Sequence, residues 1–291
     1  MPGARGVSAA SARTGIEALK LGADFLPRLG STVILAPAVL LLLVWGSWPF
    51  ALLVLATAVA ILWEWLTMTA ARPKPWLLAV GGGVLTAAAL MLAVRPPSAA
   101  IGLVLLGMVA MTLVARGGRL MRPWPPAGLF YAAAFLLPVL VLRADPNFGL
   151  LAMLWLLAVV WSTDIAAYFC GRLLGGPKLW PRVSPNKTWS GAIGGTLFGT
   201  IAGMLALSVA EVPSVWLAAP AALVVSIVSQ GGDLFESAMK RRFGVKDSSR
   251  LIPGHGGLMD RLDGLITAAA FALLLGILRD PSAPAAGLLV W

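Results

Sequence analysis

The sequence predicts an all-α protein, a polytopic integral-membrane helical bundle of about nine transmembrane helices with a cytoplasmic N-terminus. Three observations predict this class. Hydrophobic residues make up 59% of the 291 residues and charged residues only 12%, whereas soluble domains usually carry about 25% charged residues. The apolar residues gather in segments close to the length that crosses a bilayer as a helix, roughly 17–25 residues. The basic residues gather in alternate breaks between these segments.

The predicted spans divide the chain into two membrane regions. We expect residues 1–29 to form an N-terminal cytoplasmic segment and 30–147 an N-terminal transmembrane region of about five helices. Residues 148–291 are expected to form a C-terminal transmembrane region of about four helices, with cytoplasmic loops over 171–187 and 240–261. The breaks carry Pro, Gly and Arg, and no soluble domain fits between them. The spans are expected near 30–46, 48–70, 76–94, 98–115, 127–142, 148–170, 188–210, 214–239 and 262–279.

The orientation follows from the basic residues, because cytoplasmic loops are rich in Lys and Arg. With a cytoplasmic N-terminus, only Arg95, Arg143 and Arg279 of the 22 basic residues face the other side. The net charge of +10 is therefore explained by topology, and no nucleic-acid partner is expected. The single Cys170 gives no internal disulfide, and no cleaved signal peptide is expected. Alanine and arginine richness favours the inner membrane of a bacterium.

Acidic residues inside the spans are candidates for function, because they are costly there. Glu64 lies near the cytoplasmic end of its span, so a structural role is favoured. Asp164 lies deeper, with Tyr168 one turn later on the same helical face. Its carboxylate must face a polar cavity, a cation or a partner. A buried pair with Arg or Lys is the alternative.

The stretch Ser184-Pro-Asn-Lys-Thr188 precedes a small-residue run that reaches Gly203. Lys187 and Thr188 are expected at a helix N-terminus, where backbone N–H groups, a hydroxyl and an ammonium suit a phosphate. The glycine spacing of a Walker motif is missing. An N-cap with a lysine that reaches the interface is an equally good interpretation.

Two pairs of acids flank a basic loop that is expected over 240–261. Asp233 and Glu236 end one span, and Asp260 and Asp263 begin the next, both with i, i+3 spacing. Oxygen ligands of this kind suit Mg²⁺. Structural salt bridges to Lys240, Arg241 and Arg261 are the alternative.

The loop between these acids combines basic residues with a glycine-rich turn. The basic residues also suit anionic lipid headgroups, but that interpretation leaves the interleaved acids and the turn Pro253-Gly-His255-Gly-Gly257 unexplained. Glycines let a backbone approach a ligand closely, so His255 is expected to contact substrate. The basic residues of the loop are Lys240, Arg241, Arg242, Lys246, Arg250 and Arg261.

The stretch from Ser237 to Asp263 resembles the phosphatidate cytidylyltransferases, or CDP-diacylglycerol synthases. It carries S-x-hydrophobic-K-R, then K-D, P-x-H-G-G and D-R-x-D without a gap. The block from Asp164 to Gly171-Arg172, the Ser184-Pro-x-Lys187-Thr188 stretch and Gly232-Asp233-x-x-Glu236-Ser237 are also similar, in the same order. The resemblance is strong over roughly 160–265. One departure is Ser190, where the family often has Glu, so no role is carried to Ser190.

The resemblance implies an integral-membrane enzyme that joins CTP and phosphatidate into CDP-diacylglycerol and pyrophosphate, with Mg²⁺ required and the active site facing the cytoplasm. The residues expected to be catalytic are Asp233, Asp260, Asp263, Lys240 and His255. Those expected to bind substrate are Ser184, Lys187, Thr188, Arg241, Lys246, Asp247, Arg261 and Arg172. Those expected to hold metal are Asp233, Asp260 and Asp263, with Glu236 and Asp164 as support.

Two other classes of protein are alternatives. A secondary transporter using Asp164 and Asp233 as an ion relay would show inverted repeats, but the charges are confined to the C-terminal half. A CDP-alcohol phosphotransferase would carry a D-G-x-x-A-R pattern, which is absent. Small-residue helix faces are compatible with a homodimer.

Overall fold

The computed structural model describes residues 36–116, 123–213, 215–249, 251 and 256–291. Within these ranges, eight helices are long and apolar enough to cross a membrane, and a shorter apolar helix, Ala36–Trp45, precedes them. The prediction of an all-α polytopic membrane bundle is confirmed. The predicted cytoplasmic segment 1–29 lies outside the described residues, so the full extent of the first span and the side of the N-terminus stay predictions.

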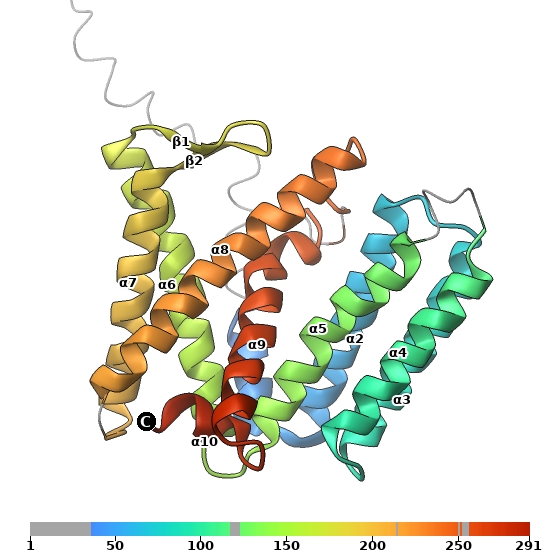
Figure 1. Ribbon diagram of the computed structural model, residues 1–291, viewed down its shortest axis with the longest axis horizontal. Helices are drawn as coiled ribbons and strands as arrows, with labels where there is room; N and C mark the ends of the chain where they lie inside the picture. Colours follow the sequence, from blue (N-terminus) through green and yellow to red (C-terminus); the bar gives the residue numbers. More distant parts are fainter. Residues whose placement is uncertain (1–35, 117–122, 214, 250, 252–255) are drawn as a thin grey trace, which may run out of the picture.

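The N-terminal region consists of α2 (Ser47–Met68), α3 (Lys74–Leu92), α4 (Pro97–Val114) and α5 (Trp124–Ala144). Proline occupies the first turn of α3, α4 and α5, where its missing N–H costs nothing. The α3–α4 pair forms the outer edge of the molecule, and α2 and α5 lie between that pair and the C-terminal region (Figure 1). Accordingly, 61% of the α5 span is buried, compared with 22% for α3 and for α4.

The C-terminal region adds four long helices. They are α6 (Gly149–Leu174), α7 (Trp189–Val209), α8 (Ala219–Arg242) and α9 (Met259–Arg279). The short helix η2 (Val215–Ala218) leads into α8, and α10 (Pro284–Leu289) folds back against α9. Helix α8 crosses the region obliquely, so that its C-terminal end lies at the same end of the bundle as the start of α9 (Figure 1).

A β-hairpin replaces most of the loop that was expected over 171–187. Helix α6 continues to Leu174, and β1 (Lys178–Trp180) then pairs antiparallel with β2 (Ser184–Thr188). The turn into the hairpin uses Gly175 and Gly176 at φ of 62° and 99°, a conformation that favours glycine. Strands of three and five residues are too short to give a periodic signal in the sequence.

Helices α6 and α7 pack with their backbones close together. Gly191, Gly195, Gly199 and Gly203 of α7 are spaced four residues apart, and all four are buried. A Cβ atom at Gly195 would lie 2.8 Å from the Thr163 carbonyl oxygen of α6. Small residues at this spacing permit such an approach between membrane helices.

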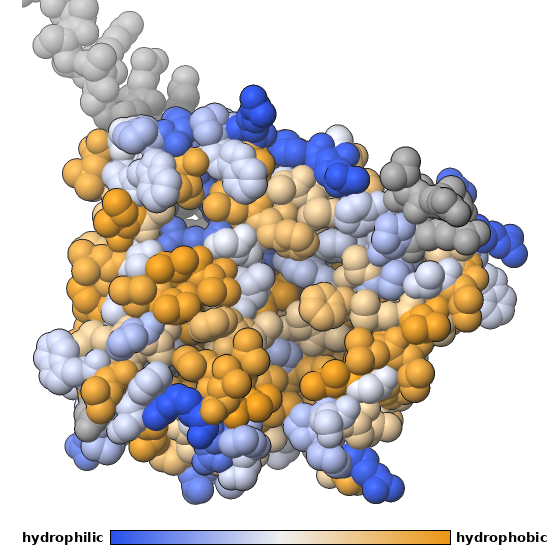
Figure 2. Space-filling view, in the orientation of Figure 1, coloured by the Kyte–Doolittle hydropathy of each residue, from blue (hydrophilic) through white to orange (hydrophobic). Residues whose placement is uncertain are grey.

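An aromatic cluster joins the two regions. Trp65 of α2 lies 5.2 Å from Tyr131 of α5, and Tyr131 lies 5.8 Å from Phe235 of α8, measured between ring centroids. Hydrophobic residues cover the middle of the visible face, and hydrophilic residues gather at its two ends (Figure 2). This distribution suits a bundle with lipid around its middle and water at its ends.

Candidate active site

A cavity of about 800 Å³ lies within the C-terminal region, at the end where the hairpin meets α8 and the start of α9. It is bounded by α6, the hairpin, α7, α8 and α9, so segments distant in sequence converge there. Most of the residues that the sequence marks as functional line it. They are Asp164, Arg172, Lys187, Thr188, Asp233, Lys240, Asp260, Arg261 and Asp263.

On one wall, Lys187 of β2 forms an ion pair with Asp233 of α8. Both side chains are partly exposed to the cavity. Thr188 is the N-cap of α7, and its Oγ1 accepts a hydrogen bond of 3.1 Å from the Gly191 N–H. The prediction of a helix N-terminus at this position is confirmed. Ser190 donates from its hydroxyl to the carbonyl oxygen of Gly175, the C-cap of α6, which ties the end of α6 to the start of α7.

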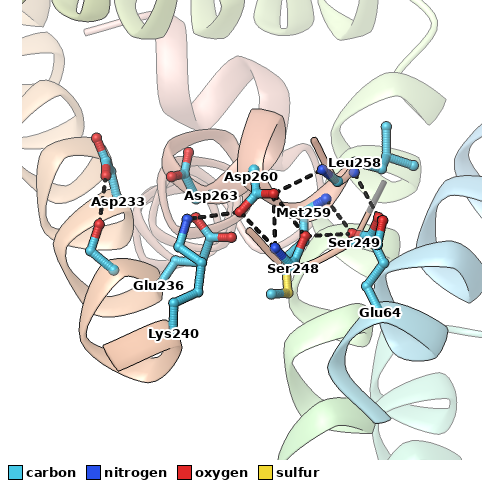
Figure 3. Close-up of polar contacts among 12 residues, drawn as sticks. Glu64, Asp233, Glu236, Lys240, Ser248, Ser249, Leu258, Met259, Asp260 and Asp263 are labelled. Atoms are coloured by element: carbon cyan, nitrogen blue, oxygen red, sulfur yellow. Dashed lines mark hydrogen bonds and ion pairs between the residues drawn. The ribbon is translucent and has the colours of Figure 1, made fainter. Parts of the chain in front are cut away.

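Two helical turns further along α8, Lys240 lies between two carboxylates. Its Nζ is 2.7 Å from Oδ1 of Asp260 and 3.3 Å from Oε2 of Glu236. Oδ2 of Asp260 accepts hydrogen bonds from the Ser248 N–H (3.0 Å), the Ser248 hydroxyl (3.0 Å) and the Gly257 N–H (2.8 Å) (Figure 3). Both oxygens of Asp260 are therefore already bound by protein groups.

Glu236 and Asp263 lie next to one another beside this pair (Figure 3). The Glu236 side chain is buried, and its Oε1 has no hydrogen-bond partner among the described residues. Within the same ranges, no salt bridge neutralises Asp263 or Asp164. Glu236 is buried, Asp263 is half-buried and Asp164 is exposed. Like charges gathered at one site repel one another, so a bound cation would stabilise this part of the cavity.

The described residues contain no group of three or more His, Cys, Asp or Glu side chains arranged to hold a metal ion. Mg²⁺, however, usually keeps several waters and is held by one or two carboxylates together with substrate phosphates. The incompletely neutralised Asp263, with Glu236 beside it and Asp233 and Asp164 on the same cavity, fits that mode of binding. Asp260 fits it less well, because a metal would have to displace its hydrogen-bond donors.

Glu64 of α2 makes polar contacts with the C-terminal region. Its side chain is fully buried, and it accepts hydrogen bonds from the segments on both sides of the loop that joins α8 and α9. The sequence favours a structural role for Glu64, and its side chain does not line the cavity. Its partners could not be inferred from the sequence, because they lie 184 to 195 residues further along the chain.

Some predicted residues do not line the cavity. Ser184 pairs with Trp180 in the hairpin, and Arg241 donates from Nε to the Val183 carbonyl oxygen at 3.4 Å. Lys246 and Asp247 are exposed on the segment after α8. His255 lies outside the described residues. The substrate contacts expected of these five residues stay predictions.

The structure also adds lining residues that the sequence did not mark as functional. Lys178 and Asn186 of the hairpin face the cavity, as does Gln230 of α8. Gln230 donates from Nε2 to Oγ1 of Thr196 at 2.9 Å, which ties α8 to α7. Gln230 is a polar residue one helical turn before Asp233, and this spacing in the sequence could have marked it as a lining residue.

Comparison with known proteins identifies the family. The model of the cytidylyltransferase family matches residues 27–278. The chain is 46% identical over 259 residues to the phosphatidate cytidylyltransferase of Brucella suis biovar 1 (strain 1330), covering 88% of this chain and 95% of that protein. It is 45% identical over 254 residues to that of Brucella abortus biovar 1 (strain 9-941), covering 86% and 93%. The enzyme of that name from Staphylococcus haemolyticus (strain JCSC1435) is 47% identical over 119 residues, covering 40% and 46%.

The fold and the cavity define an integral membrane protein with a charged site at one end of its helices. The chain belongs to the cytidylyltransferase family and is a CTP-dependent nucleotidyltransferase. Membership of this family favours an enzyme over the secondary transporter that uses Asp164 and Asp233 as an ion relay.

Proposed function

We propose that the protein is a phosphatidate cytidylyltransferase, which converts CTP and phosphatidate into CDP-diacylglycerol and pyrophosphate. Two relatives that carry this name match the chain over 86% or more of its length. The observation that carries the proposal is the single cavity in which Lys187, Lys240 and Arg261 meet Asp233 and Asp263.

The substrates explain this combination of charges. CTP brings about four negative charges and phosphatidate nearly two, because a phosphate monoester is almost fully ionised near neutral pH. Cationic side chains that surround the phosphates reduce this repulsion and stabilise the charge of the transition state. Arg172 of α6 and Lys178 of the hairpin add positive charge on the cavity wall.

In the proposed reaction, a phosphate oxygen of phosphatidate attacks the α-phosphorus of CTP. The bond between this phosphorus and the oxygen that bridges to the β-phosphate breaks, and pyrophosphate leaves with the electron pair. The attacking oxygen is already anionic, so no strong general base is needed. The protein supplies neutralisation and in-line placement. We assign the charge neutralisation to Lys187, Lys240 and Arg261.

We propose that Mg²⁺ is required, with Asp263 and Asp233 as ligands and Glu236 and Asp164 in support. A bound Mg²⁺ neutralises phosphate charge and orients the triphosphate. Asp260 then acts by holding Lys240 and the segment around Ser248. This set puts fewer direct ligands on the metal than the sequence suggests, because the hydrogen bonds of Asp260 already occupy its oxygens.

We further propose that the site faces the cytoplasm, in the inner membrane of a bacterium. The cavity lies at the end of the bundle where β1, β2 and the segment after α8 carry their basic residues, and CTP is a cytoplasmic nucleotide. Cysteine variants at Lys246 and at Arg279 would test this orientation in intact cells, on a Cys170→Ser background. Labelling by an impermeant maleimide should occur at residue 279 only.

The activity is tested with the full chain purified in detergent. With CTP, phosphatidate and MgCl₂, we expect equal amounts of pyrophosphate and CDP-diacylglycerol, measured by a coupled phosphate assay and by mass spectrometry. Diacylglycerol, which lacks the phosphate, is the control acceptor, and EDTA should stop turnover. Pyrophosphate release that does not depend on phosphatidate would contradict the proposal.

A further inference from the structure

The Glu64 carboxylate binds two separate segments of the catalytic region. Oε1 accepts hydrogen bonds from the Ser249 hydroxyl (2.6 Å) and the Leu258 N–H (2.8 Å). Oε2 accepts from the Met259 N–H (2.6 Å) and the Ser248 hydroxyl (3.2 Å) (Figure 3). These five residues are called the Glu64 cluster below. Its carboxylate is fully buried and fully occupied.

The groups around the Glu64 carboxylate are hydrogen-bond donors. A carboxylate oxygen accepts hydrogen bonds, and two backbone N–H groups and the Ser249 hydroxyl donate to Glu64. The Ser248 hydroxyl has one proton to share between Glu64 and Asp260. Two of the donors are backbone N–H groups at the start of α9, where unpaired amides and the helix dipole favour a negative charge. Helix α9 has no side-chain cap of its own from Leu258. Glu64 therefore supplies the cap from a different helix, α2.

The cluster is continuous with the cavity. The Ser248 hydroxyl lies 3.2 Å from Glu64 and 3.0 Å from Asp260, so one side chain touches both carboxylates. Asp260 in turn holds Lys240 at 2.7 Å. Asp260 and Asp263 belong to the first turns of α9, so a shift at the start of this helix would move both.

The packing around the cluster leaves no spare volume. A Cβ atom added at Gly257 would collide with the Ser248 hydroxyl, and it would lie 2.8 Å from Oε1 of Glu64 and 3.0 Å from Oδ2 of Asp260. The backbone at Gly257 thus fills the space between the two carboxylates. Hydrogen bonds and packing together specify one position for this end of α9.

We propose that Glu64 is a positioning residue for nucleotidyl transfer. As a buried hydrogen-bond acceptor supplied by the N-terminal region, it fixes the start of α9 and the Ser248–Ser249 segment, and through them the placement of Asp260, Lys240 and Asp263. Glu64 does not line the cavity, so its effect reaches the substrates only through these residues. The inference rests on the CTP-dependent transfer and not on which lipid is the acceptor.

The test compares Glu64→Gln with Glu64→Asp in the full-length enzyme. Glutamine has the same size, but its amide NH2 group would replace one carboxylate oxygen and face groups that donate hydrogen bonds. Two donors cannot form a hydrogen bond with each other. A misplacement of about 1 Å costs about 100-fold in rate, so we expect Glu64→Gln to lose about this factor in kcat and to need several-fold more Mg²⁺ for half-maximal rate. Glu64→Asp keeps the charge and should recover part of the rate despite its shorter side chain.

Hydrogen exchange gives a readout that does not depend on turnover. The Leu258 and Met259 amides, which donate to Glu64, should exchange faster in Glu64→Gln than in the wild type, with the middle of α9 unchanged. If phosphatidate fails to support turnover, the proposed acceptor is wrong, and the exchange result still decides the role of Glu64.

Leu62→Ala is the matched control. Leu62 is a buried neighbour on α2, and it packs toward Gly81 of α3, away from the cluster. The Leu62→Ala substitution should lower the melting temperature and leave kcat and the Mg²⁺ requirement close to those of the wild type. The proposal is overturned if Glu64→Gln keeps wild-type kcat, if Glu64→Asp is less active than Glu64→Gln, or if both α2 variants lose kcat in proportion to stability.

Discussion

The two membrane regions solve the problem of helix packing in different ways. Glu64 is the only carboxylate between residues 36 and 144, and the helices there pack through apolar side chains. The C-terminal region instead places carboxylates and cations around one cavity and brings α6 and α7 together through glycines. This one acid within the helices of the first region is bound to the second region. The N-terminal region therefore contributes to the active site without lining it.

The largest effect should come from the charge at Asp263. Asp263→Asn keeps the shape and removes an anion that no salt bridge neutralises among the described residues. Loss of a preorganised charge at the reacting centre should lower kcat on the order of 1000-fold. CTP-dependent pyrophosphate release measures this. Asp280→Asn, just beyond α9, is the control, and equal activity of Asp263→Asn and the wild type would remove Asp263 from the site.

A somewhat smaller effect is expected from Gly257→Ala, which tests whether the two regions are coupled. The added methyl group would collide with Ser248 and press on Glu64 and Asp260. We expect a loss of about 1–3 kcal/mol in stability, as for other overpacked sites, and a fall in kcat of about 100-fold through misplacement. Gly231→Ala on α8 meets no atom within 4 Å and should change neither quantity. Wild-type kcat in Gly257→Ala would argue against the coupling.

Lys187→Met tests whether the cations of the C-terminal region bind the nucleotide. It removes the partner of Asp233 and one phosphate contact. We expect KM for CTP to rise about tenfold, equivalent to about 1.4 kcal/mol. Lys74→Met removes a cation of the N-terminal region that contacts Thr67 and Trp63, and it should leave KM unchanged. An unchanged KM in Lys187→Met would contradict the assignment.

The smallest effect on activity should come from substituting the glycines of α7 that pack against α6. A Cβ atom at Gly199 would collide with Oγ1 of Thr163 and lie 3.1 Å from the Val159 carbonyl oxygen. Gly199→Ala should lower stability by about 1–3 kcal/mol, read as a lower melting temperature, with a small change in kcat. Gly82→Ala on α3 meets open space. Equal melting temperatures for the two variants would show that close backbone packing does not distinguish the regions.

Sequence reasoning identified the helical membrane class and most of the cavity. The sequence marks Asp164, Asp233 and Asp263 because charge is rare in this chain, and a charge in or at the end of an apolar span usually serves a polar site. It marks Lys187 because this residue precedes an expected helix N-terminus. The helix start after Thr188 followed from its capping chemistry. These signals are local in sequence.

The features that the sequence did not reveal depend on contacts between distant segments. The partners of Glu64 become visible only when α2 lies beside the start of α9. The occupied oxygens of Asp260 require the backbone of Ser248 and Gly257 to be placed. Arg241 looked equivalent to Lys240, but adjacent residues on a helix point in different directions, and only Lys240 lines the cavity.

The glycine face of α7 has a consequence for how a bulky lipid reaches the reacting atoms. Because α6 and α7 touch backbone to backbone, sliding or spreading them apart would break many contacts at once, so this pair should behave as a stiff wall. If the acceptor is the lipid proposed above, we expect its acyl chains to enter past α8 rather than between α6 and α7. Spin labels across α6 and α7 should accordingly report one fixed separation throughout turnover.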